Sequence, residues 1–394
     1  TMDAANAIRS GEFSVAVAGG MESMSNAPYL LQKGRQGLRM GHGTLTDSMI
    51  HDGLTDPYKN VHMGNCAELC AARYAFTREA QDAYAFESYQ RARRANEAGD
   101  FKAEMIPVTI EGKRGATQVD KDEEPFATPE EKLLKMGTLR PAFQKDGTVT
   151  AANASKINDG ASALVVMAAE KAHELHLSPL ARIVGQATSG LAPKLVLMTP
   201  VDAVRRVLAK TGWSMSDVDL VELNEAFSVQ ALAVARCLEL PPERTNPNGS
   251  GISLGHPIGA TGARIIVTLL HALAHIVEHG VLRALAKGLF ARDDLPHLGV
   301  DGGFDIAVDA VGRGQTADQV VIGWLAGIEG NIDALIVGTA GMHHGVQQAM
   351  IGVGAAIESR RRAVHLDDRA RIEADARAHD RAERHVDLHV GRGR

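Results

Sequence analysis

The stretch Asn246–His271, NPNGSGISLGHPIGATGARIIVTLLH, constrains the fold of this chain more than any other. Its first half is a glycine-rich loop, and glycine lets a backbone take strained angles or lie close to a ligand. The loop leads His256 to the start of a helix, with Pro257 near the first turn, where a backbone N–H has no partner anyway. There the positive end of the helix dipole lowers the pKa of a histidine. The pattern predicts a general base beside an anionic intermediate.

Glycine spacing alone leaves the chemistry open. GHPIGATG lacks the G-x-G-x-x-G order and the Lys-Ser/Thr ending of nucleotide loops, and a tight loop–helix junction with an incidental histidine fits the same residues. A second motif, Asp217–Phe227 (DVDLVELNEAF), favours a catalytic site. In it, we expect an alternating apolar strand to end at Asn224 and Glu225 to open a helix.

The NEAF strand end and the GHPIGATGA loop together resemble the thiolase family. Ala16–Tyr29 (AVAGGMESMSNAPY) is similar to the family's strand and turn before its loop domain, and Gly147–Gly160 (GTVTAANASKINDG) to its pantetheine-binding segment. The resemblance runs from Thr1 to about His275. It implies an α/β fold with two similar βαβ halves and a loop-domain insertion, the first half being incomplete. A ketoacyl synthase is a related alternative, but NEAF with GHPIGATGA favours a thiolase.

The resemblance implies a division into domains. Residues 1–26 and 158–178 are the remainder of the N-terminal half, 27–157 form the loop domain for CoA binding and the tetramer contact, and 179–275 form the C-terminal half. Alternating strands and helices predict a parallel sheet covered by helices.

Three elements are predicted from their own residues. Phe13–Ala18 is expected to form a short strand that Gly19-Gly20 breaks, and Leu180–Ala187 a second strand. Thr77–Gly99 is expected to form an amphipathic helix with a threonine cap and a glycine end.

The resemblance also implies two catalytic residues. His256 matches the histidine that activates the family's nucleophilic cysteine and donates to the thioester oxygen, while Asn224 matches the asparagine that holds a water at the same oxyanion hole. Ala226 and Phe227 are expected to line the pocket.

Further residues match positions along the CoA arm of the family. His62 and Met63 correspond to a pair beside the pantetheine arm and the acyl pocket, although as a bare pair they fit ordinary packing. Phe143, Ala151 and Ser155 correspond to pantetheine contacts: an apolar wall, a small residue and a hydroxyl that can bond an amide. As a lone residue, Ser155 also fits a turn or a helix N-cap.

The cysteines depart from the family pattern. Because Thr1 lies inside a helical pattern, we expect an N-terminal truncation that removes the nucleophilic cysteine. Gly280–Phe290 contains neither the cysteine nor the glycines of the family's second catalytic loop, Cys-x-Gly-Gly-Gly. Cys66 and Cys70, at helical i, i+4 spacing, fit core packing better than a metal site, and Cys237 fits neither catalytic role. The chain alone is therefore predicted to be inactive, and the alternative is a non-catalytic CoA-binding or oligomerising remnant.

Composition limits the partners. The net charge of −6 on 394 residues calls for neither nucleic acid nor a membrane surface, and no apolar run reaches the length of a membrane span. Three cysteines fit a reducing cytoplasm. The resemblance implies acetyl-CoA or acyl-CoA as substrate, no other cofactor and no metal, a role in fatty acid metabolism, and a homotetramer or homodimer.

The pattern changes in residues 276–394, which we leave unassigned. A reading-frame shift or a join to unrelated sequence is our hypothesis, and a genuine extra domain is the alternative. The tail from about residue 360 is rich in Arg, Asp, His and Ala, which predicts disorder.

Overall fold

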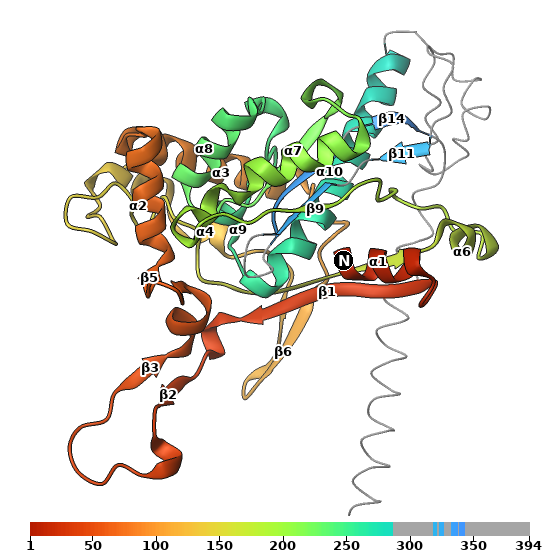
Figure 1. Cartoon of the computed structure of the whole chain (residues 1–394). Coiled ribbons are helices and arrows are strands. Elements are labelled where there is room, and N and C mark those ends of the chain that lie inside the picture. Colours follow the sequence, from red (N-terminus) through yellow and green to blue (C-terminus); the bar gives the residue numbers. More distant parts are fainter. Residues whose placement is uncertain (287–317, 321–322, 327–331, 338, 343–394) are drawn as a thin grey trace, which may run out of the picture.

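The computed structural model describes residues 1–286, 318–320, 323–326, 332–337 and 339–342, and strands and helices mix throughout this part (Figure 1). The helices are α1 (Met2–Ser10), α2 (Met63–Tyr74), α3 (Arg78–Ala98), α4 (Glu124–Ala127), α5 (Glu130–Leu133), α6 (Ala169–Glu174), α7 (Thr199–Thr211), α8 (Ser228–Leu238), α9 (Gly251–Leu254) and α10 (Ile258–Ala286). The strands are β1 (Val15–Ser23), β2 (Tyr29–Leu31), β3 (Leu45–Asp47), β4 (Thr55–Asp56), β5 (Val61–His62), β6 (Val108–Gly112), β7 (Gly115–Val119), β8 (Asp159–Met167), β9 (Ala187–Thr188), β10 (Leu220–Leu223), β11 (Asp318–Val320), β12 (Gly323–Ala326), β13 (Ile332–Val337) and β14 (Thr339–Met342).

The longest strand pair joins β1 and β8, which run antiparallel along their full length. The predicted break at Gly19-Gly20 is wrong, because β1 continues to Ser23. A Cβ on Gly19 would lie 2.2 Å from the carbonyl oxygen of Ser162, and a Cβ on Gly20 would lie 1.9 Å from that of Gly259. These glycines therefore allow β1 to lie close to β8 and to the first turn of α10, and they do not end the strand.

A second sheet has the order β10-β13-β12-β9. The expected parallel pairing holds for β9 with β12, but β13 runs antiparallel to both β10 and β12. The prediction of parallel strands is also wrong for β1 and β8, which pair antiparallel. The whole predicted loop-domain insertion connects these two strands, and not the single crossover helix that joins parallel neighbours. The strand predicted over Leu180–Ala187 is reduced to β9.

Strands β11 to β14 lie within residues 276–394, the segment left unassigned from sequence, and β13 pairs with the strand that leads to Asn224. Helix α10 also continues past residue 275 to Ala286. The tail from about residue 360, predicted to be disordered, lies outside the described residues.

The core lies on both faces of β10. Val221 and Leu223 belong to an apolar cluster that draws on α2, α7 and α8, while Leu220 packs against α10. Cys70 belongs to the first cluster and Cys66 is buried nearby on α2, and the two residues have exposed fractions of 5% and 2%. Their prediction as core residues is confirmed.

Helix α10 is a core helix. Its window Ile258–His275 is long and apolar enough to cross a membrane on length and composition alone, in contrast to the expectation from the sequence. Half of that window is buried inside the fold, where Ile265 and Leu269 are completely covered. This burial accounts for its apolar character.

Residues 27–157, the predicted loop domain, contain α2, α3 and three small hairpins, of which β2–β3 projects furthest from the body in Figure 1. The predicted helix Thr77–Gly99 is confirmed as α3. The Thr77 side chain accepts a hydrogen bond from the backbone N–H of Ala80 at 3.2 Å, and Gly99 ends the helix with a left-handed φ of 84°.

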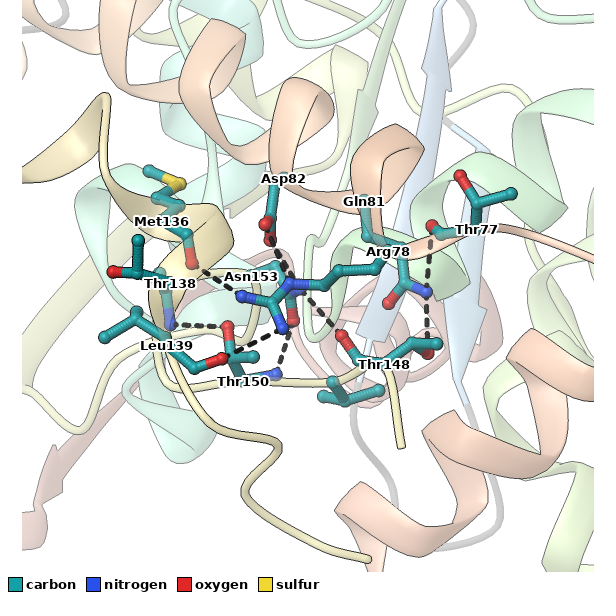
Figure 2. Close-up of polar contacts among 12 residues, drawn as sticks. Thr77, Arg78, Gln81, Asp82, Met136, Thr138, Leu139, Thr148, Thr150 and Asn153 are labelled. Atoms are coloured by element: carbon teal, nitrogen blue, oxygen red, sulfur yellow. Dashed lines mark hydrogen bonds and ion pairs between the residues drawn. The ribbon is translucent and has the colours of Figure 1, made fainter. Parts of the chain in front are cut away.

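Figure 2 shows how the first turn of α3 holds the segment that leads toward the site. The Arg78 guanidinium pairs with Asp82 at 2.7 Å and donates to the carbonyl oxygen of Leu139 at 3.1 Å. Asp82 in turn accepts from Nδ2 of Asn153 at 2.8 Å. Residues 148–153 are thereby attached to α3 through side chains that are far apart in sequence.

Candidate active site

The two predicted catalytic side chains converge. Asn224 directly follows β10, and His256 lies two residues before α10. Nδ2 of Asn224 lies 3.3 Å from Nε2 of His256. An amide nitrogen only donates, so in this orientation of the Asn224 amide Nε2 is the acceptor and carries a lone pair. Asn224 is completely buried and His256 is half-buried, which gives the pair a protected environment open on one side.

The other side of the imidazole is also occupied. Nδ1 of His256 lies 2.8 Å from Oγ1 of Thr261 on α10, and the backbone N–H of His256 donates to the carbonyl oxygen of Lys156 at 3.3 Å. Gly255 has a φ of 96°, and a Cβ there would lie 2.3 Å from the side chain of Asn158. The glycine thus lets the histidine loop lie against the predicted pantetheine segment.

The electrostatic surroundings keep His256 neutral. Burial, together with the smaller effect of the nearby charge of Arg264, lowers the pKa of His256 to about 4. The direction agrees with the expectation from the helix start, but burial is its main cause. Near neutral pH the imidazole is therefore a base with a free lone pair and not a cation.

The residues predicted for the CoA arm form an aromatic group beside this pair. The rings of His62 and Phe143 stack with centroids 4.9 Å apart, and Phe143 meets Phe227 edge-on at 6.2 Å. Met63 is partly buried against the same cluster. His62 also caps α2, its Nδ1 accepting from the N–H of Gly64 at 3.0 Å, and burial lowers its pKa.

The NEAF segment runs beside the pantetheine segment. The N–H of Ser155 donates to the carbonyl oxygen of Ala226 at 3.0 Å, and Phe227 forms a β-bridge with Ala154. The prediction that Glu225 opens a helix is wrong, since α8 begins three residues later, after this extended stretch. Ala151 is exposed, so the structure leaves it at the edge of the group that contains the other predicted residues.

Glu225 holds the segments around the candidate site together, a role that the sequence analysis missed. Its buried carboxylate accepts hydrogen bonds from the hydroxyls of Tyr84 at 3.0 Å and Ser88 at 2.7 Å, both on α3, and from Nδ2 of Asn246 at 3.0 Å. Asn246 also bonds both backbone groups of Leu223. Glu225 thus ties the loop domain, the NEAF segment and the histidine loop together.

Glu68 on α2 has a similar role. Its carboxylate accepts from the N–H groups of Thr148 and Val149, each at 2.9 Å. A Cβ on Gly147 would lie 2.1 Å from a carboxylate oxygen of Glu68. The partners of Glu68 and Glu225 are remote in sequence, so the only available signal was an acidic residue in an otherwise apolar context.

Comparison with known families decides which family this geometry belongs to. Residues 1–170 match the model of the thiolase N-terminal domain, and residues 177–289 match that of the thiolase C-terminal domain. The chain belongs to the thiolase family. The second match extends to residue 289, beyond the limit at about His275 inferred from the motifs.

Similar proteins agree with this thiolase assignment. An acetyl-CoA acetyltransferase of Chromobacterium violaceum is 46% identical over 306 residues, which cover 77% of this chain and 74% of that protein. One of Pseudomonas aeruginosa is 51% identical over 271 residues, 68% of each chain. The crystal structure of the Bacillus anthracis acetyl-CoA acetyltransferase has a TM-score of 0.70 and 39% identity, covering 86% of this chain and 75% of that one. The thiolase-like α/β fold and membership of an acyltransferase family are therefore confirmed.

Proposed function

We propose that this thiolase chain carries the acyl-CoA site of an acetyl-CoA C-acyltransferase. The observation that supports this most directly is the 3.3 Å contact between Asn224 Nδ2 and His256 Nε2, beside the aromatic group of His62, Phe143 and Phe227. The relatives named acetyl-CoA acetyltransferase support the same substrate class. In this proposal, Met63, Ala151, Ser155 and Ala226 border the pantetheine arm, and His256 and Asn224 face the thioester.

The proposed chemistry needs a base that becomes a donor. The lone pair on Nε2 of His256 takes the proton of a thiol, which then attacks an acyl thioester and releases CoA. The resulting Nε2–H donates to the thioester oxygen, together with a water held by Asn224, where negative charge develops. The departing CoA thiolate takes the proton from Nε2 as it leaves. A base then takes the α-proton of a second acetyl-CoA, and the resulting carbanion attacks the acyl thioester carbon, forms the new C–C bond and expels the enzyme thiolate. Thiolytic cleavage is the reverse sequence.

The three cysteines of the chain are poor candidates for that thiol. Burial raises the pKa of Cys66, and it raises the pKa of Cys70 to about 12, which favours inert thiols. Cys237 lies at the far end of α8, roughly 13 Å along the helix axis from Ser228. These observations support a second part of the proposal: the 394-residue chain binds CoA but does not turn over by itself.

Calorimetric titration with CoA tests the binding part. Phe143→Ala removes an aromatic contact and should weaken binding about 3–10-fold, the effect of losing about 0.5–1.5 kcal/mol. Phe126→Ala, which changes an exposed ring on α4, is the matched control and should bind like the parent. Absence of CoA binding to the folded parent chain would refute the acyl-CoA site.

An assay of acetoacetyl-CoA cleavage by CoA tests the catalytic part. Turnover by the chain above a blank would show that one of its cysteines is activated and would overturn the proposed inactivity. Binding without turnover is the result that the proposal expects, and it also agrees with the non-catalytic CoA-binding remnant. We further propose a cytoplasmic location, a role in fatty acid metabolism, no cofactor beyond the CoA thioester and a homo-oligomeric state, as the family resemblance implies.

A further inference from the structure

Thr261 is the one side chain in contact with the second imidazole nitrogen of His256 in the described part of the chain. It lies in the first turn of α10 and is 1% exposed, so water does not compete for its hydroxyl. Its Oγ1 lies 2.8 Å from Nδ1 of His256 and 2.9 Å from the carbonyl oxygen of Pro257. The hydroxyl therefore lies between two groups that can both accept its single proton.

The hydroxyl can donate to either group, and the first arrangement uses the carbonyl oxygen of Pro257. The Thr261 hydroxyl donates to the Pro257 carbonyl, the usual bond from a helical threonine to the residue four positions earlier. With its proton so placed, Oγ1 can only accept, and Nδ1 of His256 must carry the hydrogen. The lone pair then lies on Nε2, which is where the amide N–H of Asn224 points. In this arrangement both contacts of the imidazole use the same tautomer, with the hydrogen on Nδ1.

A second arrangement of the hydrogen bonds around the imidazole uses the opposite tautomer, with the hydrogen on Nε2. Rotating the Asn224 amide by a half-turn would place Oδ1 at the imidazole and require a hydrogen on Nε2. Oδ1 is buried and has no hydrogen-bond partner in the described part of the chain, so it is free to take that place. Asn224 alone does not select between the two arrangements, because its amide can offer either a donor or an acceptor.

We propose that Thr261 is a positioning residue that holds His256 in the Nδ1–H tautomer and so presents the Nε2 lone pair toward the reacting atoms. The value of this tautomer for catalysis rests on the proposed function, but the tautomer itself does not. A hydrogen on Nε2 in the resting state would leave the imidazole without a base at the thiol.

The test is nitrogen-15 NMR of the imidazoles in the complete chain near neutral pH, since the two tautomers give distinct shifts at Nδ1 and Nε2. His256→Gln identifies the signals of His256. The parent should show the Nδ1–H form. Thr261→Val removes the acceptor, and the ratio of Nδ1–H to Nε2–H should fall about tenfold, the effect of losing one hydrogen bond. Thr261→Ser keeps the hydroxyl and should restore the parent spectrum.

Thr268→Val is the matched control. Thr268 is equally buried on α10, and its hydroxyl contacts Glu104 at 3.4 Å and not the imidazole, so the tautomer should not change. A purely structural effect of losing a buried threonine hydroxyl would alter both valine variants alike. If Thr261→Val fails to fold, Thr261→Ala replaces it, and the tautomer of the parent still decides. An Nε2–H form in the parent, or an unchanged ratio in the folded variants, would overturn the inference.

The outcome is separable from that of the proposed function. If the parent chain fails to bind CoA and still shows the Thr261-dependent tautomer, the proposed substrate is wrong and the positioning role holds. If CoA binds and the tautomer does not depend on Thr261, the reverse is true.

Discussion

Glu222 is a carboxylic acid in the protein interior, where burial disfavours its charged form. It is completely buried on β10, two residues before Asn224, and neither carboxyl oxygen has a hydrogen-bond partner in the described residues. Burial raises the pKa of Glu222 to about 8, although the Arg264 guanidinium acts in the opposite direction. The folded protein therefore holds this side chain protonated at neutral pH.

The raised pKa predicts a pH-dependent effect of Glu222→Gln. Between the unfolded value of 4.5 and about 8, the folded state binds a proton that the unfolded state has released, so stability falls as pH rises. The glutamine amide of the variant does not ionise, so the variant does not lose stability in this way. Near pH 4.5 the free energy of unfolding of the variant should match that of the parent. Above about pH 8 it should exceed the parent value by about 2–5 kcal/mol.

Urea unfolding across this pH range measures the difference. Glu243→Gln, at an exposed position, is the control and should track the parent at every pH. A constant difference between Glu222→Gln and the parent would mean that this carboxyl does not titrate between the two values.

At the scale of elements, the crossing of β1 over the first turn of α10 is the tightest contact near the site. A Cβ on Gly20 would lie 1.9 Å from the carbonyl oxygen of Gly259, and both atoms belong to backbones that cannot rotate away. The carboxylate of Glu22 on β1 also accepts from the N–H of Gly259 at 3.1 Å. This crossing therefore fixes the position of the helix start that follows His256.

Gly20→Ala should destabilise the fold by about 1–3 kcal/mol, because the two elements must separate to admit a methyl group. Equilibrium unfolding in urea gives the value, and the CoA affinity should fall with it, since the start of α10 moves. Gly137→Ala is the control, because a Cβ there meets nothing within 4 Å. An equal effect of both substitutions on the free energy of unfolding would show that the crossing tolerates a methyl group at position 20.

At the scale of the whole molecule, the β2–β3 arm stands away from the body (Figure 1). Its large apolar side chains are exposed, with Met40 at 98%. The others are Tyr29, Leu30, Leu31, Leu38 and Leu45. Exposed apolar groups gathered on one projection favour a contact with another chain, and the proposed homo-oligomer supplies a second copy.

Leu38→Asp with Met40→Asp should lower the mass of the native assembly, because charges in an apolar contact lose their hydration. Native mass spectrometry or light scattering measures the change. The control is Leu134→Asp with Leu175→Asp, two exposed leucines away from the arm, which should leave the mass unchanged. A monomeric parent, or an arm variant with the parent mass, would contradict the prediction.

Local patterns were sufficient for much of the fold and for the central pair of the site. The caps of α3 and the glycine-proline start of α10 depend on neighbours within a few residues, so their sequence signals are complete. Asn224 and His256 were found because two short motifs mark them. The positions around Phe143 and Ser155 came from the family resemblance and not from their own chemistry.

Other features depend on partners that no local pattern specifies. Gly19 and Gly20 look like breakers, yet they admit a neighbouring strand and helix, and Glu225 looks like a helix start, yet its partners lie on α3 and in the histidine loop. The sequence by itself determined the family and both ends of α3, and through the family resemblance it marked Asn224 and His256, because those signals lie within one or two turns of chain. Only the tertiary structure decided strand direction, the buried carboxyl contacts and the tautomer that Thr261 imposes, because each requires segments far apart in sequence or an orientation set by packing.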